Sequence, residues 1–264
     1  MKEKKCWMLA GRLLLGLSLA LCLSFGSGSV FGAEGIDPEA DRILRSMSSY
    51  LAGASAFSVT ADVDNEIITR EGQKLQLSAS ASMVLKRPAG LYAERKGMFA
   101  DVALFFDGKT LTLYGKKLNA FAQVAAAGEI DDAIRTLEME TGVDAPGADL
   151  LFSDPYAILS AGVEQGTYLG IAYVGGVACH HLAFREAQLD WQLWVQDGDA
   201  PLPMKYVITS KWQTAAPQYA VRLHEWNMNP QIDADRFTFT APQGATKLDT
   251  LPVNEMGEVT LEEE

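Results

Sequence analysis

Cysteine is scarce in this chain of 264 residues, which contains three. Cys6 and Cys22 lie within the first 32 residues, so only Cys179 is left in the rest of the chain. A segment with one cysteine cannot form an internal disulfide, and its stability must come from secondary structure and a packed core. We expect Cys179 to be a buried structural residue rather than a nucleophile.

Positive charge is also scarce, because 22 basic residues face 34 acidic ones and give a formal net charge of −12. The part beyond residue 32 is more acidic still, since the preceding segment contains one acid and four basic residues: Lys2, Lys4, Lys5 and Arg12. Nucleic acid and anionic lipid surfaces repel such a chain, so we expect no nucleic-acid partner. Residues 255–264 are predicted to form an acidic flexible tail.

Long apolar runs are absent except near the N-terminus, where residues 13–23 are almost wholly apolar. Basic residues precede this run, and small residues lead up to Ala33. This order is typical of an export signal that is cleaved, and the run is shorter than the roughly 20 residues of a membrane-spanning helix. We predict a signal peptide at residues 1–32, a periplasmic protein, and one domain over residues 33–254.

Two forms of membrane anchoring are the alternatives to cleavage. One is an uncleaved signal, and the other is a lipid attached to Cys22. The lipoprotein cleavage box needs a small residue before its cysteine, and Leu21 occupies that place. We therefore favour a chain without an anchor.

Histidines and the common catalytic motifs are few. His180 and His181 are neighbours on a predicted strand, so their side chains point to opposite faces, and His224 lies on another strand. A zinc site needs several converging ligands, and no nucleophile elbow, phosphate loop or dinucleotide fingerprint occurs beyond residue 32. We expect no metal, no cofactor and no enzymatic activity; an enzyme would need these histidines or carboxylates to meet in a cleft.

The clearest pattern present is a strand with one apolar face. Apolar side chains occupy the odd positions of this stretch: Leu75, Leu77, Ala79, Ala81, Met83 and Leu85. Mostly polar side chains occupy the even positions, which is the pattern of a half-buried strand. Arg87-Pro88 ends the strand, and Asp107-Gly108 predicts a hairpin further on. An apolar sheet face needs a cover.

The remaining pattern predicts a mainly β (α+β) chain in one domain. Asp37-Pro38 starts a helix that Gly53 ends, and two short helices are expected at residues 130–137 and 155–159. We count about a dozen antiparallel strands, with short connections typical of a meander. Their expected ranges are 57–70, 75–85, 91–96, 101–106, 109–114, 118–124, 167–173, 177–185, 190–195, 204–212, 219–226 and 236–240. We expect Trp191 and Trp212 to be core residues.

Several stretches in this order resemble a known family. They are Lys86-Arg87-Pro88, residues 106–114, residues 119–124, residues 201–206 and Phe237-Thr238-Phe239. Over residues 37–250 the chain resembles a domain-of-unknown-function family of predicted periplasmic proteins that is related to the LolA/LolB-like lipoprotein carriers. The resemblance implies a curved antiparallel half-barrel of about 11–12 strands, with an N-terminal helix and short helices as a lid on its concave face.

The resemblance also implies a function, because the concave face of the carriers receives the acyl chains of a lipoprotein. In LolA an arginine a few residues after the Arg-Pro pair holds the lid by hydrogen bonds. Here Leu91-Tyr92 occupies the comparable place, and Arg95 falls three residues later. This departure puts the LolA latch, and with it true lipoprotein-carrier activity, in doubt.

We predict a non-enzymatic binding protein for an acyl chain, a lipid or a lipidated protein. The lid contacts are expected to be Ile130, Ile134 and Leu137. The alternative is a cell-envelope protein-interaction or sensor module with the same half-barrel and a sealed core. The predicted lining residues of the cavity are Leu77, Ala79, Met83, Leu85, Val102, Leu104, Phe106, Leu111 and Leu113.

Overall fold

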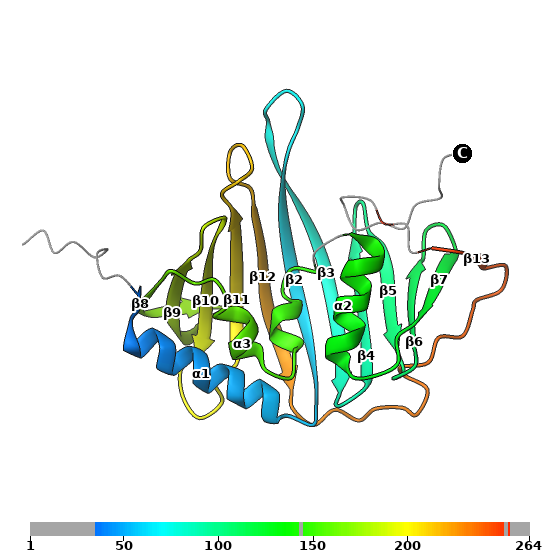
Figure 1. The fold of residues 1–264 in the computed structure, drawn as a ribbon, viewed down its shortest axis with the longest axis horizontal. Helices are drawn as coiled ribbons and strands as arrows, with labels where there is room; N and C mark the ends of the chain where they lie inside the picture. Colours follow the sequence, from blue (N-terminus) through cyan, green and yellow to red (C-terminus); the bar gives the residue numbers. More distant parts are fainter. Residues whose placement is uncertain (1–34, 143–144, 251–252, 254–264) are drawn as a thin grey trace, which may run out of the picture. The chain divides into compact units, whose positions relative to one another are not determined.

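The computed structural model describes residues 35–142, 145–250 and 253, all within a unit that spans residues 33–264. The predicted signal peptide, Cys22 and the acidic tail lie outside the described residues. One 13-stranded sheet runs through the described part, in the order β1-β8-β9-β10-β11-β12-β2-β3-β4-β5-β6-β7-β13. The sheet is open and curved, and helices cover one of its faces (Figure 1).

Two meanders build the sheet and join along β2 and β12. The first contains β2 (Ala56–Ile68), β3 (Lys74–Lys86), β4 (Gly90–Gly97), β5 (Asp101–Phe106), β6 (Thr110–Gly115) and β7 (Ala120–Ala125). The second contains β8 (Gln165–Val174), β9 (Val177–Arg185), β10 (Leu189–Gln196), β11 (Pro203–Ser210) and β12 (Gln218–Asn227). Every pairing among these strands is antiparallel, which confirms the predicted fold class.

Two very short strands extend the sheet at its edges, and both pair in parallel. β1 (Gly35–Ile36) lies beside β8, and β13 (Thr246–Leu248) lies beside β7. Segments of two and three residues are too short to show a period of alternation, so the sequence did not predict them.

The long β2–β3 pair carries the alternation that the sequence predicted. Val59 lies opposite Met83, and Val63 lies opposite Ala79, so the apolar side chains of both strands share one face. Ser82 and its even-numbered neighbours face the other way. The apolar face is the concave one, on which the helices lie (Figure 1).

Helix α1 (Pro38–Gly53) crosses this face beside the second meander (Figure 1). The Asp37 carboxylate accepts a hydrogen bond of 2.7 Å from the Glu39 amide, and Pro38 fits the first turn because it has no amide hydrogen to leave unpaired. One stripe of the helix is buried: Ala40, Ile43, Leu44, Met47 and Leu51. This stripe joins the core formed by β2, β10, β11 and β12.

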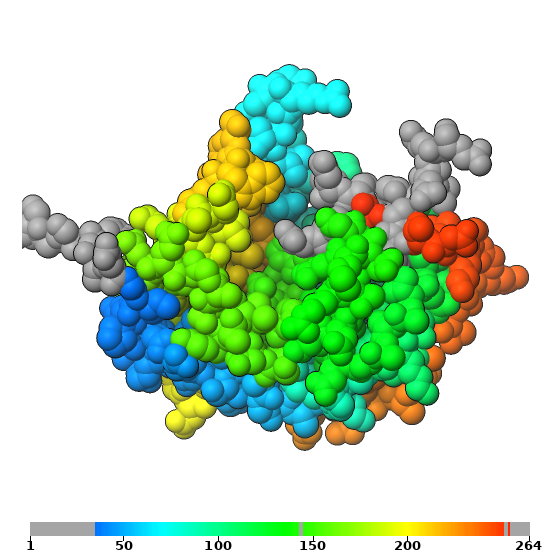
Figure 2. Space-filling view, viewed as in Figure 1, coloured from blue at the N-terminus to red at the C-terminus, as the bar shows by residue number. Residues whose placement is uncertain are grey.

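Helix α2 (Ile130–Thr141) covers the first meander. It begins at a reciprocal cap between Glu129 and Asp132 and ends at Gly142, whose φ of 63° lies in the left-handed region that glycine adopts without strain. Ile130, Ala133 and Ile134 pack against a second core that includes Leu85 and Phe106. The short helices η1 (Ala148–Leu151) and α3 (Pro155–Leu159) contact α1, and η1 also contacts α2. The space-filling view shows α1 in blue and α2 in green on the same side of the molecule (Figure 2). None of the helices in the described ranges has the length and apolar character needed to cross a membrane.

Two details of the prediction were wrong. Residues 236–240 form no strand; instead Phe239 packs against the rings of Phe105, Tyr114 and Phe121. The alternation of Phe237 and Phe239 therefore reflects anchoring to the sheet rather than membership of it. Trp191 is buried as expected, but Trp212 is 64% exposed because it lies in the turn between β11 and β12.

Candidate functional site

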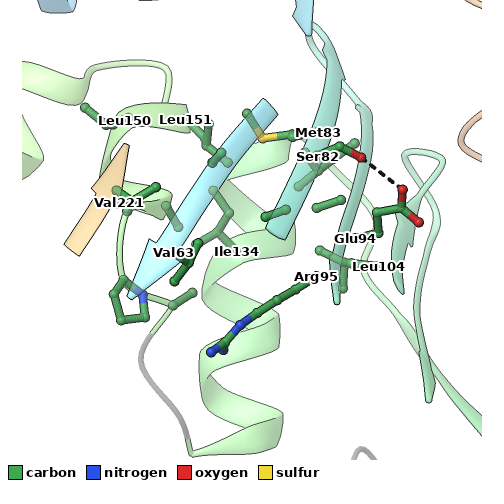
Figure 3. Close-up of a pocket in the computed structure, with 18 of the residues that line it drawn as sticks. Val63, Ser82, Met83, Glu94, Arg95, Leu104, Ile134, Leu150, Leu151 and Val221 are labelled. Carbon is green, nitrogen blue, oxygen red and sulfur yellow. Dashed lines mark hydrogen bonds between the residues drawn. The ribbon is translucent and has the colours of Figure 1, made fainter. Parts of the chain in front are cut away.

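An apolar cavity of about 350 Å³ lies between the concave sheet face and the helical cover. Strands β2, β3, β4, β5, β6 and β12 form its wall, and α2, η1 and the chain between them form its other side (Figure 3). The volume is within the range of small-molecule sites, about 300 to 1,000 Å³. The helical cover therefore leaves part of the space beside the first meander empty of side chains.

Several residues predicted for the cavity lie on its surface. Met83, Val102, Leu104 and Leu113 line the wall, and Ile134 and Leu137 face them from α2. Their convergence follows from strand phase on one side and helical spacing on the other. Whether they contact a ligand stays a prediction.

The other predicted residues share the concave face but do not line this cavity. Leu85, Phe106, Leu111 and Ile130 are fully buried in the second core, where α2 packs directly on the sheet. Leu77 and Ala79 lie further along β3, beside a small separate hollow near Met98. Strand phase alone does not reveal how far along a strand the cover extends, which is why these residues could not be separated from the lining residues by sequence.

The lining residues predicted from the sequence did not include the part of the cavity wall that β2 and β12 form. Its lining side chains are Val59, Ala61, Val63, Tyr219, Val221 and Leu223. The alternation in residues 57–63 was visible in the sequence and placed these side chains on one face. What it could not show is that β2 pairs with β12, a strand near the other end of the chain, as the pairing of Tyr219 with Asn65 illustrates.

Arg87 joins the sheet to the helical cover. Its Nη2 donates hydrogen bonds of 3.0 Å to the carbonyl oxygens of Leu151 and Phe152, at the end of η1. Burial lowers the pKa of Arg87, although the carboxylates of Asp131 and Glu129 partly offset that effect. The resemblance placed a latch arginine after the Arg-Pro pair, whereas here the arginine of the pair itself bonds to the cover.

A second connection holds α2 to the segment after η1. The Asp131 carboxylate accepts hydrogen bonds from the amide of Ser153 at 2.8 Å and from its hydroxyl at 2.7 Å. Asp131 also lies in the first turn of α2, where the helix dipole favours a negative charge. The cover is therefore tied to the sheet and to itself by polar contacts at its ends.

Glu94 and Arg95 contribute the only charged side chains among the described lining residues. They extend in opposite directions from β4 (Figure 3). Glu94 accepts hydrogen bonds from Lys116 at 2.7 Å, Tyr92 at 2.8 Å and Ser82 at 3.1 Å. The bond from Lys116 is the main cause that lowers the pKa of Glu94. Glu94 is thus satisfied on the convex side.

Arg95 is different, because its side chain extends along the cavity beside α2 (Figure 3). Its Nε is buried and has no hydrogen-bond partner among the described residues. Tyr219 also lines the cavity; burial raises the pKa of its phenol, and the positive charge of Arg95 lowers it by a smaller amount. The cavity therefore combines apolar walls with one positive charge.

A half-buried acid lies where η1 meets the sheet. Asp149 accepts a hydrogen bond of 3.4 Å from the Tyr206 hydroxyl. Burial raises the pKa of Asp149 to about 6, and it also raises the pKa of Tyr206 well above its usual value. Asp149 is consequently an acid that folding holds partly in its neutral form.

None of the three histidines lines the cavity, and the neighbours His180 and His181 do not share a partner. Their contacts differ: His180 with Tyr168 and Asp197, His181 with Gln192, and His224 with Asp62. Among the described residues no group of three or more His, Cys, Asp or Glu is placed to hold a metal ion. Cys179 is buried, as predicted, and burial raises the pKa of its thiol.

Comparison with solved structures gives distant likenesses. An uncharacterized conserved protein from Thermus thermophilus is 12% identical with a TM-score of 0.47, covering 80% of this chain and 99% of its own. LprF from Mycobacterium bovis is 17% identical with a TM-score of 0.43, covering 81% and 100%. A LolA superfamily protein from Nitrosomonas europaea is 9% identical with a TM-score of 0.37, covering 76% and 97%.

Comparison at the level of sequence gives one result. No curated protein matches the chain. The family described as "Predicted periplasmic protein (DUF2092)" matches residues 40–251, which is most of the chain and includes every strand of the cavity wall. This chain therefore belongs to that family of predicted periplasmic proteins.

Proposed function

We propose that this protein is a non-enzymatic periplasmic binding protein that holds an acyl chain, of a lipid or of a lipidated protein, in its concave cavity. The observation that carries the proposal is the apolar cavity of about 350 Å³ beside the second core. In this proposal residues 1–32 direct export, residues 33–254 form the binding domain, and residues 255–264 are an acidic tail.

The energetics suit reversible binding. Each buried methylene contributes about 0.8 kcal/mol, so ten contribute roughly 8 kcal/mol. Association and ordering cost about 4 to 15 kcal/mol. The two terms are of similar size, which favours a ligand that can be taken up and released.

A variant that fills the cavity tests the proposal. Ala81 lines the wall between Ala61 and Arg95, so a tryptophan there occupies the space intended for the ligand. Ser80 is its exposed neighbour on the opposite face and offers a matched control. Titration with a fluorescent fatty-acid analogue should give binding for the native chain and for Ser80→Trp, and at least ten-fold weaker binding for Ala81→Trp. Equal binding by all three would place the ligand elsewhere and contradict the proposal.

One observation favours a second function, that of a protein-interaction module. Ile171 and Tyr173, on the edge-side strand β8, are 49% and 73% exposed, which is unusual for large apolar and aromatic side chains. A module of this kind predicts that crosslinking in the cell envelope captures one specific partner through β8, and that Tyr173→Ser abolishes the capture. It does not need the cavity, so Ala81→Trp should leave the crosslink unchanged.

A further inference from the structure

The positive charge of Arg95 is the one feature of the cavity that acyl-chain binding does not explain. Arg95 lies between Ala81 on β3 and Val102 on β5, and both of those residues line the cavity. A wall built only to receive hydrocarbon would have an apolar residue at this position, because Arg95 is half-buried and its buried Nε loses water there without gaining a hydrogen bond from the described residues.

The charge is not neutralised by the described residues. Glu94, the only acid of the lining among them, points away from the cavity and is already bonded to Lys116, Tyr92 and Ser82. Arg95 forms no ion pair with a described residue, and its buried Nε has no hydrogen-bond partner among them. Charges that are partly withdrawn from water are normally paired, so a guanidinium that the described residues leave unpaired is available to the anionic group of a ligand.

We propose that the ligand is an amphiphile with an anionic head group, and that Arg95 pairs with this head while the acyl chain lies against the apolar walls. This inference rests on the proposed function and names the class of ligand. A guanidinium presents a planar fork of donors that matches a carboxylate or a phosphate. Tyr219 lines the same cavity, and its hydroxyl is a second polar group available to such a head.

Three probes with hydrocarbon tails of similar length separate the contribution of the head group to the affinity from that of the tail. Dodecanoate and dodecyl phosphate have an anionic head, and dodecanol has a neutral one. Binding to the native chain is measured by isothermal titration calorimetry at a pH where both acids are ionised. A charge-assisted hydrogen bond corresponds to about a ten- to hundred-fold preference for the anionic probes over dodecanol. A stronger response to dodecyl phosphate than to dodecanoate would identify a phospholipid-type head, and the reverse a fatty acid.

The variant Arg95→Gln should abolish that preference, and Arg95→Lys should retain most of it because the charge remains. Arg222→Gln is the matched control: Arg222 is exposed on β12 and the substitution removes the same charge from the protein. Thermal unfolding separates this role from a structural one, since removing an unpaired charge should leave the midpoint of Arg95→Gln unchanged or raise it. A midpoint several degrees lower would contradict an unpaired Arg95.

The two proposals fail in different ways. If all three probes bind the native chain with equal affinity, the anionic-head inference is wrong while acyl-chain binding stands. If none of them binds, acyl-chain binding itself is wrong. A preference that survives in Arg95→Gln would also overturn the inference, because the head group would then be recognised by another residue.

Discussion

Single polar residues in this protein are placed where the cover meets the sheet. Arg87 reaches the carbonyl oxygens at the end of η1, and Asp149 on η1 meets Tyr206 of the sheet. Arg87 and Asp149 are both half-buried, and burial shifts the pKa of each toward its neutral form, so their charges are costly unless partners compensate them. We therefore expect these residues to influence how firmly the cover is held.

Asp149 makes the stability of the protein depend on pH. Its pKa of about 6 in the folded chain exceeds the ordinary value of 3.8, so folding favours the protonated form. The stabilisation is complete below about pH 4 and is lost as pH rises through about 6. Asp149→Asn keeps an acceptor for Tyr206 and removes the ionisation, so it should raise the free energy of unfolding by about 1 to 3 kcal/mol near pH 7.5 and by almost nothing near pH 4.

Denaturant unfolding at the two pH values measures this difference. Asp233→Asn is the control, because Asp233 is exposed and its substitution changes the net charge by the same amount. If Asp149→Asn raised the free energy of unfolding equally at both pH values, ionisation of the Asp149 carboxyl group would not be the cause of the stabilisation.

Arg87 should matter more for the cover than for the sheet. Arg87→Gln removes two hydrogen bonds to backbone carbonyls, a loss of about 1 to 3 kcal/mol. Hydrogen exchange should accelerate in residues 148–152, while the amides of β2 and β3 keep their protection. Lys86→Gln, one position earlier and exposed, should change neither the stability nor the exchange of residues 148–152. Unchanged exchange in 148–152 would mean that Arg87 does not hold the cover.

At the scale of elements, the segment after β12 acts as a strap over the convex face of the first meander. It places Phe239 among Phe105, Tyr114 and Phe121, and Arg236 lies 3.8 Å above the ring of Tyr92. Phe237 packs so closely on β4 that a Cβ at Gly90 would lie 2.7 Å from its ring. The strap thus links the end of the second meander to the first.

Gly90→Ala tests the importance of this contact. The added methyl group cannot be accommodated unless Phe237 moves, so we expect the free energy of unfolding to fall by about 1 to 3 kcal/mol. Gly53→Ala, near the end of α1, is the control, because no atom lies within 4 Å of the added Cβ. Equal free energies of unfolding for the two variants would show that Phe237 can move aside without destabilising the protein.

For the whole molecule, sequence patterns predicted the sheet and its apolar face well. The alternation from Leu75 to Leu85 indicated the phase of β3, and Asp37-Pro38 indicated the start of α1. Both are local signals, since neighbouring residues report the period and the cap directly. The fold class could therefore be predicted without any knowledge of long-range pairing.

The extent of the cavity could not be predicted, because it depends on contacts between distant parts of the chain. Leu104 lines the cavity while Phe106, two residues later on the same face, is sealed beneath α2. The difference arises from where α2 and η1 lie, and Arg87 helps to set that position. The sequence could not show that Arg95 lies unpaired beside the cavity for the same reason, because this depends on Glu94 forming its hydrogen bonds on the convex side.

Both proposals require that the cavity holds an amphiphile in the cell. The most direct test is native mass spectrometry of the protein purified from its own periplasm, before and after extraction of lipids with organic solvent. We predict a mass excess that corresponds to one anionic lipid and disappears on extraction, and that is absent from Ala81→Trp. A native chain that carries no lipid before extraction, with a mass equal to that of its polypeptide, would contradict both proposals.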